Sequence, residues 1–269
     1  NALNNFQSQG VIVWALTNNF NFDDADVSAA LPELYTNLDD AWITVANVEV
    51  TGTSSPSYSL QSAPCGSTAD YCMAADGTNI LMAGGNDYSV GGFAYENSTG
   101  TSFATPQVSG AVAILSNHFP NQTPEQWTDR LLASANNNLG FTQTGTVNFG
   151  NGIVHGYSNQ AGHGILDLYA ALQPITSTSY ARSIYSGSSN LNGSRHNLKD
   201  SGLVTNRSIG DGLENSLLGL NNYFYDALGG GFKYKMSNHV VSSSESQKTI
   251  DLLKEMGDLD NSLTENFSS

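Results

Sequence analysis

One eleven-residue stretch, from Gly100 to Gly110, constrains the fold of this chain more than any other part of it. The stretch reads G-T-S-F-A-T-P-Q-V-S-G and runs directly into the apolar segment A-V-A-I-L. The glycine permits a backbone turn that a side chain would obstruct, and we expect Thr101 to cap a helix whose first turn carries Ser102. Unpaired N–H groups and the positive end of the helix dipole meet there, so Ser102 is well placed for acyl transfer.

The helix is predicted to end near Asn117 and to lie inside a large core. Residues 108–115 make it apolar nearly all round, which is typical of a buried helix. We expect Pro106 close to the helix start, where a missing N–H costs least. Ser109 and Gly110 are small enough to let a neighbouring backbone approach.

The apolar run G-V-I-V-W-A-L at residues 10–16 predicts a buried parallel strand. The run ends in the polar residues Thr17, Asn18 and Asn19. Ligands of open α/β sheets bind at the carboxyl ends of strands, so Asn18 is a candidate site residue. The alternative is a loop asparagine that hydrogen-bonds to its own backbone.

The string Gly-Thr-Ser-x-Ala-x-Pro-x-Val-x-Gly closely resembles the nucleophile motif of the subtilisin-like serine proteases, the subtilases. The strand end Ala15-Leu16-Thr17-Asn18 resembles the family's Ala-Ala-Gly-Asn, and residues 162–171 resemble the motif that closes the domain. The resemblance covers residues 10 to about 172. It implies an α/β fold with a doubly wound, mostly parallel sheet and helices on both faces, incomplete at the N-terminus.

The resemblance also implies a role for each matching residue. Ser102 is expected to be the catalytic nucleophile of a serine-type endopeptidase that acts on polypeptides, and Asn18 the amide of the oxyanion hole. Ala15 and Thr17 fall on the wall of the primary specificity pocket, and Thr17 replaces the usual glycine. Asp76 stands where the family motif Ala-Pro-Gly-x-x-Ile has proline.

Subtilases use Asp, His and Ser in that chain order, yet neither Asp-[Ser/Thr]-Gly nor His-Gly-Thr precedes residue 10. We therefore expect both motifs upstream of this sequence. Asp200-Ser201-Gly202 imitates the first motif, but it follows the serine and does not end an apolar strand. All five histidines follow Ser102 and lack the Gly-Thr pair. We expect His163, inside the domain-closing motif, to be structural.

Two other functions stay open. One alternative is an inactive subtilase-like surface passenger or binding domain. A substitution in either upstream motif would indicate this alternative. An α/β-hydrolase esterase would combine Ser102 with Asp167 and His196. Against this second alternative, Ala104 replaces the second glycine of the G-x-S-x-G motif, and residues 96–100 separate the serine from a strand.

The charge balance narrows the set of partners. The chain has 24 acidic and 9 basic residues, a net charge of −15 and a pI near 4.3. This argues against nucleic acid and anionic membranes as partners, and no apolar run is long enough to span a bilayer as a helix. We expect no cofactor. The aspartates between residues 23 and 40 are acceptable calcium ligands, but their spacing matches no loop motif and favours a solvated surface.

The two cysteines, Cys65 and Cys72, flank a loop-like stretch with no CxxC or zinc spacing. This indicates a short disulfide loop and an oxidising compartment, with a pair of reduced thiols as the alternative.

The composition changes beyond about residue 175. We expect residues 1–175 to be the carboxyl-terminal part of the peptidase domain and residues 176–269 to be a linker and an extension. Residues 223–232 read Y-F-Y-D-A-L-G-G-G-F. They resemble the Phe-Asp-Ala-Leu-Gly segment that follows the protease domain in bacterial autotransporter subtilases. This resemblance implies a secreted or outer-membrane surface protein, with a translocator β-barrel encoded downstream.

Overall fold

The computed structural model describes residues 2–53, 56–84, 95–175, 203–206, 221–235 and 240–243. The chain divides into two compact units. The first contains residues 1–190 together with 225–230, and the second contains residues 191–224 and 231–269. The short segment 225–230 therefore belongs to the first unit, although it follows the predicted linker.

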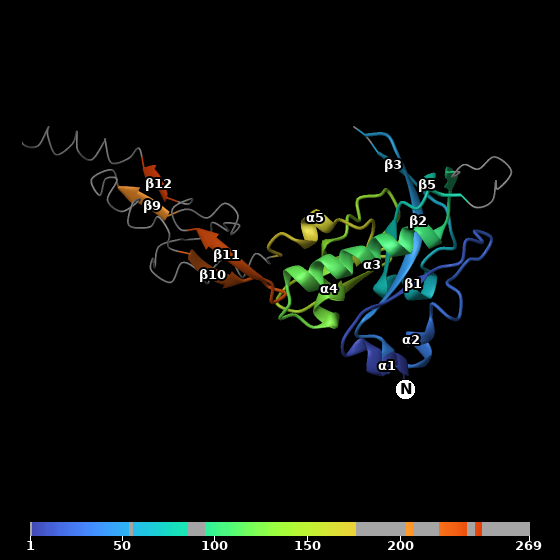
Figure 1. The fold of residues 1–269 in the computed structure, drawn as a ribbon, viewed down its shortest axis with the longest axis horizontal. Helices are drawn as coiled ribbons and strands as arrows, with labels where there is room; N and C mark the ends of the chain where they lie inside the picture. Colours follow the sequence, from blue (N-terminus) through green and yellow to red (C-terminus); the bar gives the residue numbers. More distant parts are fainter. Residues whose placement is uncertain are drawn as a thin grey trace, which may run out of the picture. The chain divides into compact units, whose positions relative to one another are not determined.

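The first unit is built on a four-stranded sheet in which β2 is the central strand (Figure 1). Its strands are β1 (Ile12–Ala15), β2 (Trp42–Thr51), β3 (Ser57–Leu60) and β4 (Cys72–Ala75). β1 and β4 pair in parallel with β2, whereas β3 pairs antiparallel with its second half. The strand predicted at residues 10–16 is confirmed as β1.

Helices surround this sheet. They are α1 (Ala2–Gln7), α2 (Leu31–Leu34), α3 (Thr101–His118), α4 (Pro124–Ser134) and α5 (Leu168–Ala171), with short 3-10 helices η1 (Thr36–Leu38) and η2 (Gly66–Tyr71). The long helix α3 packs across β1, β2 and β4 (Figure 1). α4 begins at Pro124, and Thr123 and Gln126 form a reciprocal capping box before it. The α/β fold expected from the sequence is confirmed.

The core centres on β2. The first seven residues of this strand are all buried, as expected for a parallel strand covered on both faces. The Trp42 ring stacks on Trp14 with 5.7 Å between ring centroids, and its Nε1 donates a 3.1 Å hydrogen bond to the carbonyl of Ala29. The ring contact packs β1 against β2, and the hydrogen bond joins β2 to the chain just before α2.

The remaining described strands form pairs. They are β5 (Ile80–Ala83) with β6 (Tyr95–Ser98), β7 (Gly145–Asn148) with β8 (Val154–Tyr157), β9 (Leu203–Asn206) with β12 (Val240–Ser243), and β10 (Asn221–Tyr225) with β11 (Gly231–Lys235). β7 and β8 pair antiparallel and form a hairpin. No helix within the described ranges is long and apolar enough to cross a membrane.

Candidate active site

The first turn of α3 is held by a side chain from the loop after β1. Asn18 Oδ1 accepts a 2.8 Å hydrogen bond from the backbone N–H of Thr101 and a 3.2 Å bond from its hydroxyl. Gly100 is the N-cap residue and Thr101 the first helical residue, without a side-chain cap of its own. The prediction that Thr101 caps the helix is therefore wrong, because its hydroxyl is turned toward Asn18.

These contacts fix the orientation of the Asn18 amide. A backbone N–H donates only to an acceptor, so the oxygen of the amide faces Thr101 and its Nδ2 donor is left for another partner. Ser102, the next residue, is exposed at the same end of α3. A Cβ at Gly100 would lie 3.1–3.4 Å from the Asn18 amide atoms, so glycine permits this close arrangement. The structure thus brings Asn18 and Ser102 to one end of one helix.

Ala15 and Thr17 lie on either side of the end of β1. Ala15 pairs with Val45 of β2, and both side chains of the predicted pocket wall are half-buried. The carbonyl of Thr17 accepts from the N–H of Ala63 at 2.9 Å, and its hydroxyl accepts from the N–H of Asn19 at 3.3 Å. Thr17 is therefore fixed at the carboxyl end of the strand, beside Asn18.

The burial of α3 differs from the prediction. Its buried residues beyond the first turn are Ala104, Val108, Ala111 and Leu115. Their spacing of four, three and four places them in one stripe against the sheet. On the other side, Ile114 is 46% exposed, and a Cβ at Gly110 would meet nothing within 4 Å. The expectations of an all-round buried helix and of a backbone packed on Ser109 and Gly110 are wrong. Pro106 lies near the start of α3 but inside the helix, in its second turn.

Two histidines form a pair elsewhere in the unit, with His163 buried and His155 half-buried. His163 Nε2 lies 2.9 Å from the carbonyl of Asp70, so this nitrogen carries the proton. His163 Nδ1 then accepts from His155 Nδ1 at 2.9 Å. Burial lowers the pKa of His163 to about 4, and burial also lowers the pKa of His155. Both nitrogens of His163 are occupied, which agrees with the structural role expected for it.

The residues of the esterase alternative give it no support. The Asp167 carboxylate caps α5 by accepting a 2.8 Å bond from the N–H of Ala170. His196 and the sequence 200–202 lie outside the described residues.

The disulfide between Cys65 and Cys72 closes the loop that contains η2, with 6.0 Å between the Cα atoms. Asp24, one of the acidic residues considered for calcium, is tied to this loop instead. Its Oδ1 accepts a 2.6 Å bond from the backbone N–H of Ser67, and this bond lowers the pKa of Asp24. No group of three or more His, Cys, Asp or Glu side chains in the described ranges is placed to hold a metal ion.

The segment Tyr225–Gly230 makes contacts in the first unit that local sequence patterns did not indicate. Arg130 Nη2 of α4 donates to both carboxylate oxygens of Asp226, at 2.7 and 2.6 Å, and both side chains are fully buried. The Arg130 guanidinium carbon lies 4.4 Å from the centre of the Phe119 ring. Arg130 Nη1 donates to the carbonyls of Ala171 and Gln173.

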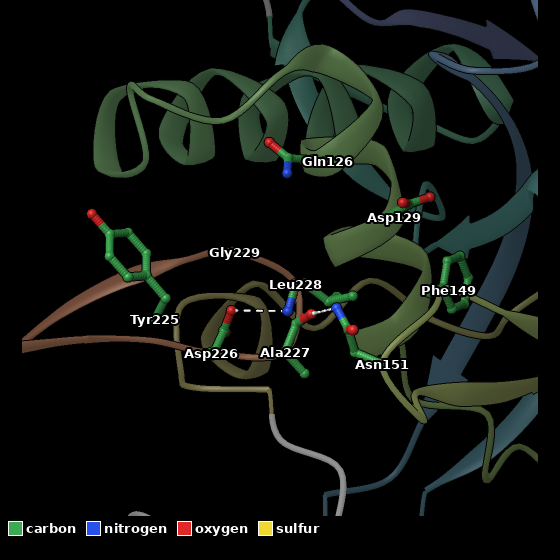
Figure 2. A pocket seen from close by; sticks show the side chains of 9 residues that line it. All are labelled: Gln126, Asp129, Phe149, Asn151, Tyr225, Asp226, Ala227, Leu228 and Gly229. Atoms are coloured by element: carbon green, nitrogen blue, oxygen red, sulfur yellow. Dashed lines mark hydrogen bonds between the residues drawn. The ribbon is translucent and has the colours of Figure 1, made fainter. Parts of the chain in front are cut away.

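A cavity of about 310 Å³ is lined by residues of α4 and of this segment (Figure 2). Gln126 and Asp129 of α4 line one side, and Asn151, which donates to the Ala227 carbonyl at 2.7 Å, lines another. Burial, followed by the charges of Glu125 and Asp40, raises the pKa of Asp129 to about 7. The lining of this cavity includes neither Ser102 nor Asn18.

Comparison with known proteins identifies the family of this chain. The sequence profile of the subtilase family matches residues 1–164, and the chain belongs to that family. An extracellular serine protease of Serratia marcescens is 27% identical over 132 residues, covering 43% of this chain and 12% of that protein. The chain therefore corresponds to a small part of that relative.

Solved structures of subtilases are also similar to this chain. Fervidolysin of Fervidobacterium pennivorans, a keratinolytic enzyme related to subtilisin, aligns at 25% identity over 61% of this chain and 22% of its own, with a TM-score of 0.43. The subtilase cytotoxin SubAB assembly aligns at 20% identity over 64% of this chain and 50% of its own, also with a TM-score of 0.43.

Proposed function

We propose that this chain is the carboxyl-terminal part of the peptidase domain of a serine-type endopeptidase, with Ser102 as the nucleophile. The observation that carries the proposal is the attachment of Asn18 to the first turn of α3, one residue before Ser102. A family of hydrolases that matches 164 residues of this chain supports the same reaction class. The proposed substrate is a polypeptide.

In the proposed mechanism the Ser102 oxygen attacks the carbonyl carbon of the scissile peptide bond, and its proton passes to a histidine. The carbonyl oxygen becomes negative in the tetrahedral intermediate. The backbone N–H of Ser102 and the Nδ2 of Asn18 are the donors we assign to that oxygen. Collapse of the intermediate returns the proton to the leaving amine and leaves an acyl-enzyme, which water then hydrolyses. The histidine and its aspartate come from the Asp-[Ser/Thr]-Gly and His-Gly-Thr motifs that we propose upstream.

The primary specificity pocket is proposed to lie beside the end of β1. Ala15 and Thr17 form part of its wall in this proposal. A threonine in place of the family's glycine adds a methyl group and a hydroxyl, which would narrow that wall and make it more polar. The preferred substrate side chain should accordingly be smaller than that of a subtilase with glycine there.

The location is proposed from the disulfide and from the C-terminal segment. A disulfide between Cys65 and Cys72 forms and persists in an oxidising compartment. The relative in Serratia marcescens is described as extracellular. Together with the segment Tyr225–Gly230, these observations support secretion by the autotransporter route, with a translocator β-barrel encoded downstream.

The test is the labelling of Ser102 by a fluorophosphonate probe in the longer protein that contains the upstream motifs. Ser102→Ala should abolish both labelling and peptide hydrolysis. Ser109→Ala is the matched control, since Ser109 is an exposed serine of the same helix whose hydroxyl donates to the Thr105 carbonyl. The 269-residue chain alone should label only slowly, because a serine without its general base is a weak nucleophile.

Undiminished labelling of the Ser102→Ala variant would overturn the assignment of the nucleophile. A longer protein that carries both motifs but neither labels nor cleaves peptides would favour the inactive passenger domain. Rapid proteolysis by the isolated chain would mean that one of its own histidines is the base.

A further inference from the structure

The turn between β4 and β5 carries a residue that sets this chain apart from the family pattern. Asp76 stands where the subtilase motif has proline. Its Oδ2 accepts a 3.1 Å bond from the N–H of Val50 in β2, and its Oδ1 accepts from the N–H of Thr78 at 2.9 Å. The Thr78 hydroxyl donates to the same Oδ1. Proline has no side-chain acceptor, so none of these bonds exists with the usual residue.

The same turn is bonded to the helix that carries Ser102. The carbonyl of Asp76 accepts a 2.7 Å bond from Gln107 Nε2, which also donates to the carbonyl of Phe103 at 3.0 Å. The next carbonyl, that of Gly77, accepts from the N–H of Gly100 at 3.0 Å. The turn therefore holds α3 both at its N-cap residue and in its second turn.

The approach between turn and helix is as close as glycine allows. A Cβ at Gly77 would lie 2.4 Å from the carbonyl oxygen of Gly100 and 2.7 Å from the nitrogen of Ala104. The N–H of Gly77 donates to Asn47 Oδ1 of β2 at 2.8 Å. The turn therefore packs directly against the backbone at Gly100 and Ala104, on either side of Ser102.

The two proposed oxyanion donors are joined directly by the bonds from Thr101 to Asn18, and each is also fixed to the sheet by its own route. Asn18 follows β1, which is paired with β2, whereas the first turn of α3 is fixed to β2 through Asp76 and Gly77. We propose that Asp76 is a positioning residue, which sets the place of Ser102 relative to Asn18 by tying the β4–β5 turn to β2. This inference rests on the proposed function of Ser102.

The expected effect is a loss of turnover rather than of substrate affinity. A misplacement of about 1 Å between reacting groups lowers the rate by roughly 10²-fold. In the longer protease, Asp76→Ala should lower kcat by about 10- to 100-fold and leave KM within about twofold. Asp76→Asn keeps one acceptor oxygen, so it should retain an intermediate kcat.

Two further variants separate positioning from stability. Asp24→Ala is the matched control, because Asp24 also joins its own loop to a distant backbone N–H, while its hydrogen bonds in the described residues go to Ala25 and Ser67 and not to α3. It should lower the midpoint of thermal unfolding and leave kcat unchanged. Gln107→Ala removes an exposed side chain and the bond to the Asp76 carbonyl, so the protein should still fold, with a reduced kcat. The losses in Asp76→Ala and Gln107→Ala should not be additive.

The outcomes distinguish this inference from the proposed function. If the wild-type protein is labelled at Ser102, but Asp76→Ala and Gln107→Ala are labelled and turn over at the wild-type rate, the positioning role is overturned. Equal kcat losses in Asp76→Ala and Asp24→Ala would also overturn it, because a general loss of stability would then explain both. If the wild-type protein is not labelled at Ser102, the proposed function itself fails.

Discussion

The side-chain oxygen of Asn18 lies 2.8 Å from the backbone nitrogen of Thr101, 83 residues later in the chain. The loop after β1 therefore supplies a hydrogen-bond acceptor that the first turn of α3 otherwise lacks. The oxygen of this side chain stabilises the helix start. Its nitrogen is the donor that we propose for the substrate oxygen beside Ser102.

The first prediction follows from that division. Asn18→Ala in the longer protease should lower kcat by about 10²–10³-fold, or ~3–4 kcal/mol of transition-state stabilisation, and should change KM little. The magnitude is that of removing an oxyanion-hole amide in subtilisin, whose role we propose for Asn18. KM changes little because the donor stabilises the substrate carbonyl oxygen mainly in the transition state, where that oxygen becomes negative, and much less in the bound substrate.

Asn18→Asp is the informative companion variant. It keeps an oxygen acceptor for Thr101, and a negative charge at a helix N-terminus is favourable, so α3 should remain stable. It lacks the Nδ2 donor, so kcat should fall as far as in Asn18→Ala. A full kcat in Asn18→Asp would contradict the donor role. If only Asn19→Ala lowers kcat, the oxyanion-hole donor is Asn19 and not Asn18.

The sequence predicted the elements that present this site because each is encoded locally. The apolar run at residues 10–16 indicates β1 without reference to the rest of the chain, and the string from Gly100 to Gly110 indicates α3. The cap of α3 could not be predicted in the same way. Its acceptor is Asn18, and only the fold brings the loop after β1 to that helix. Composition alone also suggested burial of α3 on all sides, whereas the sheet covers one stripe.

The contact between Arg130 and Asp226 was missed for a related reason. The two residues are 96 positions apart, and an arginine in the polar sequence of α4 is typical of a solvated face. The resemblance of residues 223–232 to a family segment drew attention to Asp226, but it did not indicate that Arg130 is its partner. A local sequence pattern does not indicate that a charged side chain is fully buried, because its burial depends on an oppositely charged partner that is distant in the sequence.

The second prediction concerns this ion pair. Asp226→Ala should lower the free energy of unfolding of the chain by about 3–5 kcal/mol, because Arg130 would keep its buried charge without the carboxylate. The carboxylate also accepts from the backbone N–H groups of Ile175, Leu228 and Gly230, which would lose their acceptor. Urea unfolding monitored by circular dichroism gives the difference.

Two variants serve as references for that measurement. Tyr225→Ala removes a neighbouring side chain that is 70% exposed, so it should change the free energy of unfolding by less than about 1 kcal/mol. The double variant Arg130→Met with Asp226→Leu removes both charges and should be less destabilised than Asp226→Ala alone. If Asp226→Ala unfolds like the wild type, the segment 225–230 does not depend on the ion pair.

The third prediction is a loss of stability in mild acid that comes from His163. Its pKa is about 4 in the folded chain, chiefly because burial opposes the charged form, and about 6.5 when unfolded. Between these values the unfolded state binds more protons, so stability falls as the pH falls through this window. The shift corresponds to about 3 kcal/mol lost between pH 7 and pH 4.

The pH dependence has to be separated from that of other groups. Burial raises the pKa of Asp39, Asp70 and Asp129. These carboxyl groups bind protons more readily in the folded state than in the unfolded state, so they increase the stability of the fold as the pH falls, opposite to the effect of His163. His163→Gln is the suitable variant. It removes the titration of this side chain, and its amide can still donate to the Asp70 carbonyl and accept from His155. The free energy of unfolding is measured for wild type and variant from pH 7 to pH 4. The two values should converge toward acid pH, because the free energy of unfolding falls more in the wild type. Parallel curves across that range would mean that His163 does not titrate with a lowered pKa, and a proton NMR titration of its imidazole would then give a value near 6.5.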